Sequence, residues 1–301
     1  MSISVGANGL SSLLRSGRLC KSLYAIIELR YALVPRITDK DYLVSDQYQD
    51  ASNLDARFEL HSRFSVNKQG WMQWVFDQLR FSSSSRILDL GCGSAHLWLE
   101  NLRRVPAGWD ITLSDLSPGM VREARENLED SLGNIEYLVI DVQSIPFEAG
   151  SFEGVIANHM LYHVPNIEKA LEEIRRVLKP GGRFYSTTVG KSHLVELYDL
   201  VGQFAQGGDI WGEILPEKFL LDNGKAVFSN HYMEVILSRY VDRLIITEAE
   251  PLVRYVQSMM IENSVLPPDK LNEFVEFVTR EISTKGSITI TKDSGIFEAV
   301  L

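Results

Sequence analysis

One stretch of the chain, residues 85–95, constrains the fold more than any other. It reads Ser-Arg-Ile-Leu-Asp-Leu-Gly-Cys-Gly-Ser-Ala: a short apolar strand that carries Asp89 near its end, a loop with Gly91 and Gly93, and a helix-forming run. Glycines let the backbone turn sharply and approach a ligand, and the start of the next helix leaves N–H donors free. The pattern therefore predicts a ligand-binding strand–loop–helix unit, and Asp89 predicts a positive group on the ligand.

One position argues against a dinucleotide site. Such a site places a third glycine three residues after the second, close to a pyrophosphate. Here His96 stands at that position, so the G-x-G-x-x-G pattern fails. The shorter pattern of acid and two glycines also fits a plain strand–loop–helix turn, so the rest of the chain has to decide between the two interpretations.

Four further strands follow the glycine loop at regular spacing. They are expected at 111–115, at 135–142, at 154–158 and after the turn Pro180-Gly181-Gly182. Asp115 lies a little over twenty residues past the glycines, where a βαβ unit places a ribose-binding carboxylate. Asp141 ends the next strand in the same way, although solvated acids at strand ends are the simpler alternative for both. The alternation of strands and helices indicates an α/β fold with a parallel sheet and right-handed crossovers.

These segments resemble the class I S-adenosylmethionine (SAM)-dependent methyltransferases, and within them the bacterial small-molecule group. The matching stretches are ILDLGCGSA, SDLSPGMV, IDVQSIPF, ANHMLYHV and RVLKPGGRF, in the family's order. The resemblance covers about residues 45–190 well and weakens over the C-terminal third. It implies a Rossmann-like, mostly parallel seven-stranded sheet with helices on both faces. It also implies an antiparallel last strand at the sheet edge and a helical cover over the substrate.

The resemblance implies SAM as the cofactor and gives a role to the residues of the glycine loop. Asp89 is expected to hold the ammonium side of the methionine part, directly or through water. Gly91 and Gly93 are expected to let the backbone meet the methionine and the ribose. Asp115 is expected to accept hydrogen bonds from both ribose hydroxyls.

The remaining cofactor contacts implied by the resemblance come from later strand ends. Leu116 and Met120 are expected to flank the adenine. Asp141 is expected to accept a hydrogen bond from the adenine amino group, and the N–H of Val142 to meet a ring nitrogen. Asn158 is expected to lie under the methionine part.

Three residues after the fourth strand, His159, Tyr162 and His163, are the catalytic candidates. They follow the carboxyl edge of the sheet, where open α/β sheets bind their ligands. A histidine there could take a proton from an acceptor hydroxyl or amine. The alternative is that His163 caps or packs against the next helix, since many methyl transfers need only alignment of the reactants.

The segment that precedes the core contributes Tyr48, Arg57, His61 and Arg63. In related enzymes this segment closes over the cofactor, so Arg63 is expected either to meet the methionine carboxylate or to lie on the surface. No cluster of Cys, His and Asp has metal-ligand spacing, so no metal is expected.

The composition limits the classes of partner that the protein is expected to bind. The formal net charge is −10 over 301 residues, which argues against a surface built to neutralise phosphates and therefore against nucleic acid as a partner. No segment has the ~20 apolar residues of a membrane span. The two cysteines, Cys20 and Cys92, indicate a reducing compartment, and we expect a cytoplasmic protein. The oligomeric state is left open.

The chain is expected to divide into an N-terminal extension over 1–44 and a methyltransferase domain over 45–301, with a cover insertion at about 190–230. Residues 1–27 contain no Asp or Glu, which is also typical of a mitochondrial transit peptide. An amphipathic helix from Leu10 to Leu33 is favoured instead, because the apolar density continues without a cleavage-like break.

The sequence thus predicts a SAM-dependent methyltransferase that acts on a small organic acceptor. A quinone or lipid methyltransferase is the first alternative, and it would explain an apolar N-terminal helix. The second is a SAM-binding protein that does not transfer the methyl group, such as a cyclase. The residues quoted above support cofactor binding in all three cases, and they do not name the acceptor or the atom that is methylated.

Overall fold

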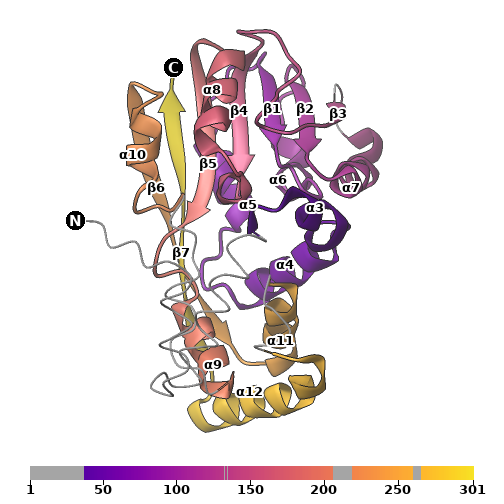
Figure 1. Cartoon of the computed structure of the whole chain (residues 1–301), viewed down its shortest axis with the longest axis vertical. Helices are drawn as coiled ribbons and strands as arrows, with labels where there is room; N and C mark the ends of the chain where they lie inside the picture. Colours follow the sequence, from indigo (N-terminus) through magenta and orange to yellow (C-terminus); the bar gives the residue numbers. More distant parts are fainter. Residues whose placement is uncertain (1–36, 132, 134, 206–218, 260–265) are drawn as a thin grey trace, which may run out of the picture.

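A seven-stranded sheet forms the frame of the molecule (Figure 1). The computed structural model describes residues 37–131, 133, 135–205, 219–259 and 266–301. The strands are β1 (Arg86–Leu90), β2 (Asp110–Asp115), β3 (Ile135–Val139), β4 (Phe152–Asn158), β5 (Leu178–Val189), β6 (Glu234–Ile246) and β7 (Ile288–Val300). Their order is β3-β2-β1-β4-β5-β7-β6, with parallel pairing from β3 to β5. The predicted Rossmann-like fold is confirmed.

Helices surround the sheet and extend below it. The helical elements are α3 (Lys40–Tyr42), η1 (Leu43–Gln47), α4 (Ser52–Phe64), α5 (Trp71–Gln78), α6 (His96–Leu99), η2 (Leu102–Arg104), α7 (Pro118–Leu128), η3 (Glu129–Ser131), η4 (Leu161–His163), α8 (Ile167–Val177), α9 (Val195–Ala205), α10 (Gly224–Ser229), α11 (Ala249–Ser258), η5 (Pro268–Lys270) and α12 (Leu271–Lys285). Across the described ranges, no helix is both long and apolar enough to cross a membrane.

Both faces of the sheet are buried, which is why its strands read as nearly continuous apolar runs. Successive side chains of a strand point to opposite faces. In β4, Val155 and Ala157 join a core with α8 and α10, whereas Ile156 joins the core of α5, α6 and α7 on the other face. The functional site therefore has to lie at the ends of the strands, where neither helical layer closes the sheet.

The last strand corrects one expectation. β7 is antiparallel, as predicted, but it lies inside the sheet, and β6 is the edge strand. Phe297 of β7 pairs with Ser186 of β5 on one side and with Leu237 of β6 on the other. β6 pairs with β7 along its whole length.

β6 and β7 continue past the end of β5 into a layer of helices. Leu244 and Ile290 on these extensions belong to one apolar core with side chains of α4, α9, α11 and α12. Figure 1 shows this helical layer at the bottom of the molecule, beyond the carboxyl end of the parallel strands. The layer covers the strand ends that would otherwise face solvent.

The predicted cover insertion at about 190–230 has two different parts. Helix α9 belongs to the helical layer, whereas α10 packs on the sheet, where the Phe228 ring lies 5.5 Å from the Phe297 ring. Residues 206–218 of that insertion lie outside the described residues, as do the expected helix from Leu10 to Leu33 and most of the extension over 1–44.

Candidate functional site

A cavity of about 470 Å³ lies between the carboxyl ends of the parallel strands and the helical layer. Almost every residue that the sequence singled out lines it. Those residues are Gly91, Gly93, Asp115, Leu116, Met120, Asp141, Val142, Asn158, His159, Tyr162 and His163. Asp89 does not line the cavity. The loops that follow the carboxyl ends of β1, β2, β3 and β4 thus bring these residues together.

The glycine loop runs along the cavity wall in a left-handed backbone conformation. Gly91 has φ +68° and Gly93 has φ +55°. A Cβ atom at Gly91 would lie 2.8 Å from Cβ of Met160, so a larger residue does not fit there. The loop is fixed by hydrogen bonds from the Cys92 N–H to the Ser114 carbonyl at 2.9 Å and from the Gly93 N–H to Asp115 Oδ2 at 3.0 Å.

Asp115 connects this loop to the next helix. Its Oδ1 accepts a hydrogen bond from the Ser117 N–H at 2.9 Å, and the Ser117 hydroxyl in turn caps α7 by accepting from the Met120 N–H at 3.3 Å. Burial raises the pKa of Asp115, although the backbone donors of Ser117 and Gly93 oppose the shift. The carboxylate is therefore held rigidly at the cavity wall, with lone pairs left for a ligand.

Asp89 lies behind the loop, with only 1% of its surface exposed. Its Oδ2 accepts a hydrogen bond from the Trp98 indole at 2.7 Å, whereas Oδ1 is buried without a partner among the described residues. Burial raises the pKa of this carboxyl to about 7. An unpartnered buried acceptor of this kind is costly, so a nearby cation or donor would be strongly favoured.

Asp141 already holds a partner that the sequence did not predict. Lys40 of α3 forms an ion pair with its Oδ2, and Oδ1 accepts from the Gln143 N–H at 2.9 Å. Partial burial would raise the pKa of Asp141, but the Lys40 and Gln143 donors outweigh it and hold the pKa below its usual value. The predicted role of Asp141 toward an adenine stays a prediction.

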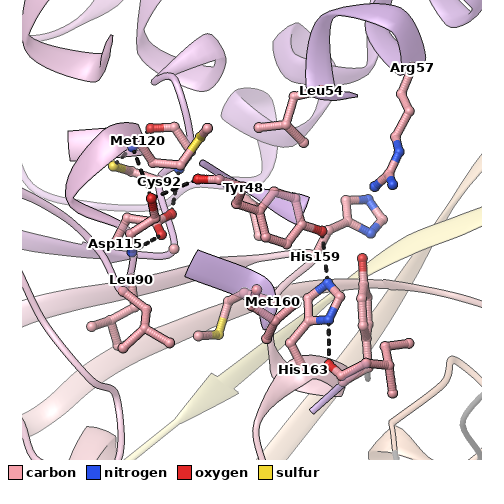
Figure 2. Close-up of a pocket in the computed structure, with 18 of the residues that line it drawn as sticks. Tyr48, Leu54, Arg57, Leu90, Cys92, Asp115, Met120, His159, Met160 and His163 are labelled. Atoms are coloured by element: carbon pink, nitrogen blue, oxygen red, sulfur yellow. Dashed lines mark hydrogen bonds between the residues drawn. The ribbon is translucent and has the colours of Figure 1, made fainter. Parts of the chain in front are cut away.

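His163 is part of a hydrogen-bonded pair with Tyr48 (Figure 2). Nδ1 of His163 lies 2.9 Å from the Ile37 carbonyl, which can only accept, so Nδ1 carries the proton. Nε2 must then accept from the Tyr48 hydroxyl, which is 2.9 Å away. Burial lowers the pKa of His163 to about 4, so the ring is a neutral acceptor. The Tyr48 hydroxyl therefore stands between His163 and the rest of the cavity.

His159 adopts a backbone conformation that is rare for a residue other than glycine, with φ +49°. Its N–H donates to the Thr187 hydroxyl at 3.0 Å, which helps to hold this turn. The ring lies 5.4 Å from the Trp71 ring, and burial lowers its pKa to about 4. Strain of this kind is often retained where a side chain must face a ligand.

Tyr162, the third catalytic candidate, lies between the two histidines. Its ring is 4.5 Å from the His163 ring and 6.4 Å from the His159 ring. Burial raises the pKa of its phenol well above the usual value, so it acts as a neutral hydroxyl.

Arg63 lies on the surface, where it pairs with Glu59 at 3.1 Å and with Glu248 at 2.6 Å. Of the two alternatives for Arg63, the surface one is correct. Among the cavity residues that were not singled out from the sequence are His193, Tyr255 and Lys292. They come from the turn before α9, from α11 and from β7. Nothing in their local sequence marks them, because only the docking of the helical layer brings them to the strand ends.

In the part of the chain that the structure describes, no group of three or more His, Cys, Asp or Glu side chains could hold a metal ion.

Comparison with known proteins shows a similarity over the part of the chain that contributes most of these residues. Residues 88–186 match a family model described as a methyltransferase domain. That range contains the glycine loop, Asp115, Asp141 and the catalytic candidates. Residues 88–186 thus carry a methyltransferase domain.

Two curated relatives resemble this methyltransferase domain. The ubiquinone/menaquinone biosynthesis C-methyltransferase UbiE of Idiomarina loihiensis is 31% identical over 160 residues, covering 52% of this chain and 62% of the relative. The demethylmenaquinone methyltransferase of Desulfitobacterium hafniense is 33% identical over 156 residues, covering 51% and 61%. The chain therefore spans about three fifths of the length of these relatives.

Solved structures support the fold of the methyltransferase domain. The YcgJ protein of Bacillus subtilis superposes with a TM-score of 0.52 at 17% identity, covering 76% of this chain and 97% of that one. The phosphoethanolamine N-methyltransferase 2 of Haemonchus contortus, solved with SAM, superposes with a TM-score of 0.55 at 18% identity, covering 87% and 59%. At these identities the likeness concerns the fold alone.

Proposed function

We propose that this protein transfers the methyl group of SAM to a small organic acceptor. The observation that carries the proposal is the shared cavity. The glycine loop and Asp115 of a methyltransferase domain line one end, and Tyr48, His159 and Tyr162 line the same space. Cofactor and acceptor would therefore meet inside one enclosure at the carboxyl edge of the sheet.

The residues at the glycine loop fit SAM. Gly91 and Gly93 have no side chain between the backbone and the cavity, and their positive φ angles fix the turn. Asp115 would accept hydrogen bonds from the ribose hydroxyls, with Leu116 and Met120 at the adenine. The unpartnered Oδ1 of Asp89 would favour the ammonium group of the methionine part, directly or through a water.

When bound, SAM supplies an electrophilic methyl group on a positively charged sulfur. The chain's contribution is to bind and orient the reactants and to exclude water, so alignment would provide most of the rate. Side chains of the helical layer line the cavity, and so do side chains of α3 and η1, which lie beside α4 in Figure 1. Covers of this kind commonly open for product release.

Two groups would take part in proton transfer, the Tyr48–His163 pair and His159. The Tyr48 hydroxyl can accept a hydrogen bond from an acceptor group while it donates its own proton toward Nε2 of His163. His159 offers a second neutral imidazole at the cavity wall. Either arrangement would remove a proton from an acceptor hydroxyl or amine as the new bond to carbon forms.

A quinone acceptor is the second candidate, because the curated relatives are named as quinone C-methyltransferases. Apolar side chains at the cavity, among them Val44, Phe58 and Leu194, would suit a flat hydrophobic ring. A protein that binds SAM without transferring the methyl group is the third.

The direct test is mass spectrometry of the products formed from SAM and a panel of acceptors. The panel contains a demethylated quinol, an amine, a phenol and a carboxylic acid. A mass gain of one methyl group that depends on the enzyme supports transfer. SAM binding without any methylated product would favour the non-transferring alternative. We further propose a cytoplasmic enzyme without a nucleic-acid partner, in keeping with the free thiol of Cys92 and the net charge of −10.

A further inference from the structure

Arg57 is a charged side chain inside the cavity without a carboxylate partner. It comes from the middle of α4 and lines the cavity, and no ion pair joins it to any Asp or Glu among the described residues. Its Nε donates to the Ser258 hydroxyl at 3.2 Å, and Nη2 donates to the Ser258 carbonyl. These two bonds, together with an interaction with the Tyr48 hydroxyl, position the guanidinium but leave its charge without a carboxylate partner.

The groups around this guanidinium are neutral. Its electrostatic neighbours are the phenols of Tyr48, Tyr162 and Tyr255. His159 and His163 also face it, and burial keeps the pKa of each near 4. Figure 2 shows the Arg57 side chain extending toward Tyr48 and His159. A guanidinium held at a cavity wall among neutral groups has no counter-ion, so this arrangement is one that an anion would complete.

The other cations of the cavity differ from Arg57 in this respect. Lys40 is neutralised by Asp141, and Lys292 lies 2.7 Å from Asp242 in a pair that is almost fully buried. Asp115, the other carboxylate that lines the cavity, is hydrogen-bonded to the glycine loop. In the described part of the cavity, Arg57 is thus the cation whose charge no carboxylate balances.

A second donor lies on the same face of α4, one turn further along. His61 lines the cavity, and its Nδ1 is buried without a hydrogen-bond partner among the described residues. Residues four apart on a helix are neighbours, so His61 can add an N–H to a ligand held by Arg57. The His61 ring packs against the Tyr255 ring at 5.5 Å, which places both beside the α11 end of the cavity.

Helix α4 runs from the glycine loop into this region. Leu54, one turn before Arg57, is the side chain that a Cβ atom at Gly93 would meet at 3.1 Å. In Figure 2, Arg57 lies at the opposite side of the pocket from Asp115 and Met120. The position favours the acceptor as the source of an anion over the carboxylate of the cofactor.

We propose that Arg57, with His61, binds an anionic group of the methyl acceptor, a carboxylate or a phosphate. The inference rests on the proposed function and names its substrate class: an acceptor that carries a negative charge away from the methylated atom. A guanidinium binds both groups through two parallel N–H bonds, which would orient the acceptor as well as hold it.

The test uses the full-length protein loaded with S-adenosylhomocysteine, the demethylated cofactor, and inorganic phosphate or acetate as the probe. Thermal unfolding is followed with increasing probe at constant ionic strength. We expect both probes to stabilise the wild-type complex, and Arg57→Gln to weaken the apparent affinity at least about tenfold. Arg63→Gln is the matched control, because Arg63 lies on the surface of the same helix. It should behave as wild type.

A second arm separates the two sources of the anion. Calorimetric affinities of S-adenosylhomocysteine and of methylthioadenosine, which lacks the amino-acid part, are compared in wild type and Arg57→Gln. We expect both affinities to change less than about threefold. A loss of at least about tenfold for S-adenosylhomocysteine alone would assign Arg57 to the cofactor carboxylate and overturn the inference.

The wild-type measurements decide the matter even if Arg57→Gln does not fold. If neither anion stabilises the loaded wild-type protein, and a neutral amide analogue is methylated as well as its carboxylate, the inference is wrong while the proposed function stands. If S-adenosylhomocysteine itself does not bind, the proposed function fails and the inference falls with it.

Discussion

The Tyr48 hydroxyl lies 2.9 Å from Nε2 of His163, and the opposite ring nitrogen is held by the Ile37 carbonyl. This relationship changes the role that the sequence gave to His163. Because Nε2 is occupied by Tyr48, the histidine reaches an acceptor through the phenol. We therefore expect Tyr48 and His163 to act as one unit.

Replacing either member of this pair should slow methyl transfer to a similar extent. If the pair removes a proton, Tyr48→Phe and His163→Asn should each lower the rate about 10²–10⁴-fold, with cofactor affinity little changed. The double variant should be about as slow as the single ones. Single-turnover rates check this, with His231→Asn as the control, since His231 pairs with Glu168 on the surface of α8. Effects below about tenfold would show that this pair is not the base. Either alignment alone or His159 would then account for the rate.

Asp89 should make the cofactor-free protein less stable as the pH rises. Burial raises its pKa in the folded protein to about 7, against ~3.9 in an unfolded chain. The protonated carboxyl thus makes its full contribution to the free energy of unfolding below about pH 4. This contribution of roughly 4 kcal/mol is lost as the pH rises through 7. The Asp89→Asn variant has no ionisable side chain at this position, so it should keep this contribution to stability as the pH rises.

Urea unfolding at about pH 5 and about pH 8 measures this difference, because comparing wild type with Asp89→Asn removes the effect of other groups. Relative to wild type, Asp89→Asn should gain stability at the higher pH. An equal difference at both pH values would show that Asp89 is already ionised in the folded protein.

Substitution of Gly91 should destabilise the protein through a steric clash as well as through its backbone conformation. Gly150 serves as a control that separates the two effects. Gly91 and Gly150 have nearly the same backbone, with φ +68° and +67°, but a Cβ atom at Gly150 meets nothing within 4 Å. Gly150→Ala should cost only the left-handed conformation, about 1–2 kcal/mol. Gly91→Ala should cost more, because its Cβ collides with Met160, and it should also weaken cofactor binding. Equal losses of stability with unchanged binding would contradict the described loop.

Asp115→Asn should weaken the binding of S-adenosylhomocysteine by about 1–3 kcal/mol, because it would remove the charge-assisted hydrogen bonds proposed between Asp115 and the ribose. The variant also loosens the loop that Asp115 holds through Gly93. Asp110→Asn, at the exposed opposite end of β2, is the control. Calorimetry should show a loss only for Asp115→Asn, and wild-type affinity in that variant would remove Asp115 from the site.

The absence of a side chain at Gly119 should allow the segment that carries Tyr48 to pack against α7. A Cβ atom at Gly119 would lie 2.0 Å from the Gln49 carbonyl oxygen, and the Ser117 hydroxyl donates to the Tyr48 carbonyl at 2.7 Å. Gly119→Ala should push this segment off α7 and reduce turnover more than cofactor affinity. Hydrogen exchange reports it directly: residues 45–64 should lose protection, and in wild type they should gain it when the cofactor product binds. Unchanged exchange would mean that the segment is not docked there.

The parallel half of the fold could be predicted because each strand carries its own signal. Asp89, Asp115 and Asp141 stand where three strands end, and the apolar runs before them match β1, β2 and β3. The position of β7 could not be predicted from the chain. Only its first four residues alternate between apolar and polar side chains, and its place between β5 and β6 depends on pairing with partners about 50 and 110 residues away.

The site residues that could be predicted are those that lie close in sequence to the end of a strand. Residues next to a strand end reach the cavity because the sheet takes them there, as for His159 after β4. The pairing of Tyr48 with His163 spans 115 residues and depends on how α4 and η1 dock on the sheet. The same docking brings Tyr255 and Ser258 of α11 against Arg57, a contact that no short motif encodes.

Isothermal titration of the wild-type protein with SAM, S-adenosylhomocysteine and NAD tests the central claim most directly. If the cavity at Gly91, Gly93 and Asp115 is a SAM site, SAM and S-adenosylhomocysteine should bind at one site per chain with micromolar affinity, roughly −8 kcal/mol, and NAD should bind far more weakly. Tighter binding of NAD than of SAM, or no binding of either SAM compound, would contradict the account.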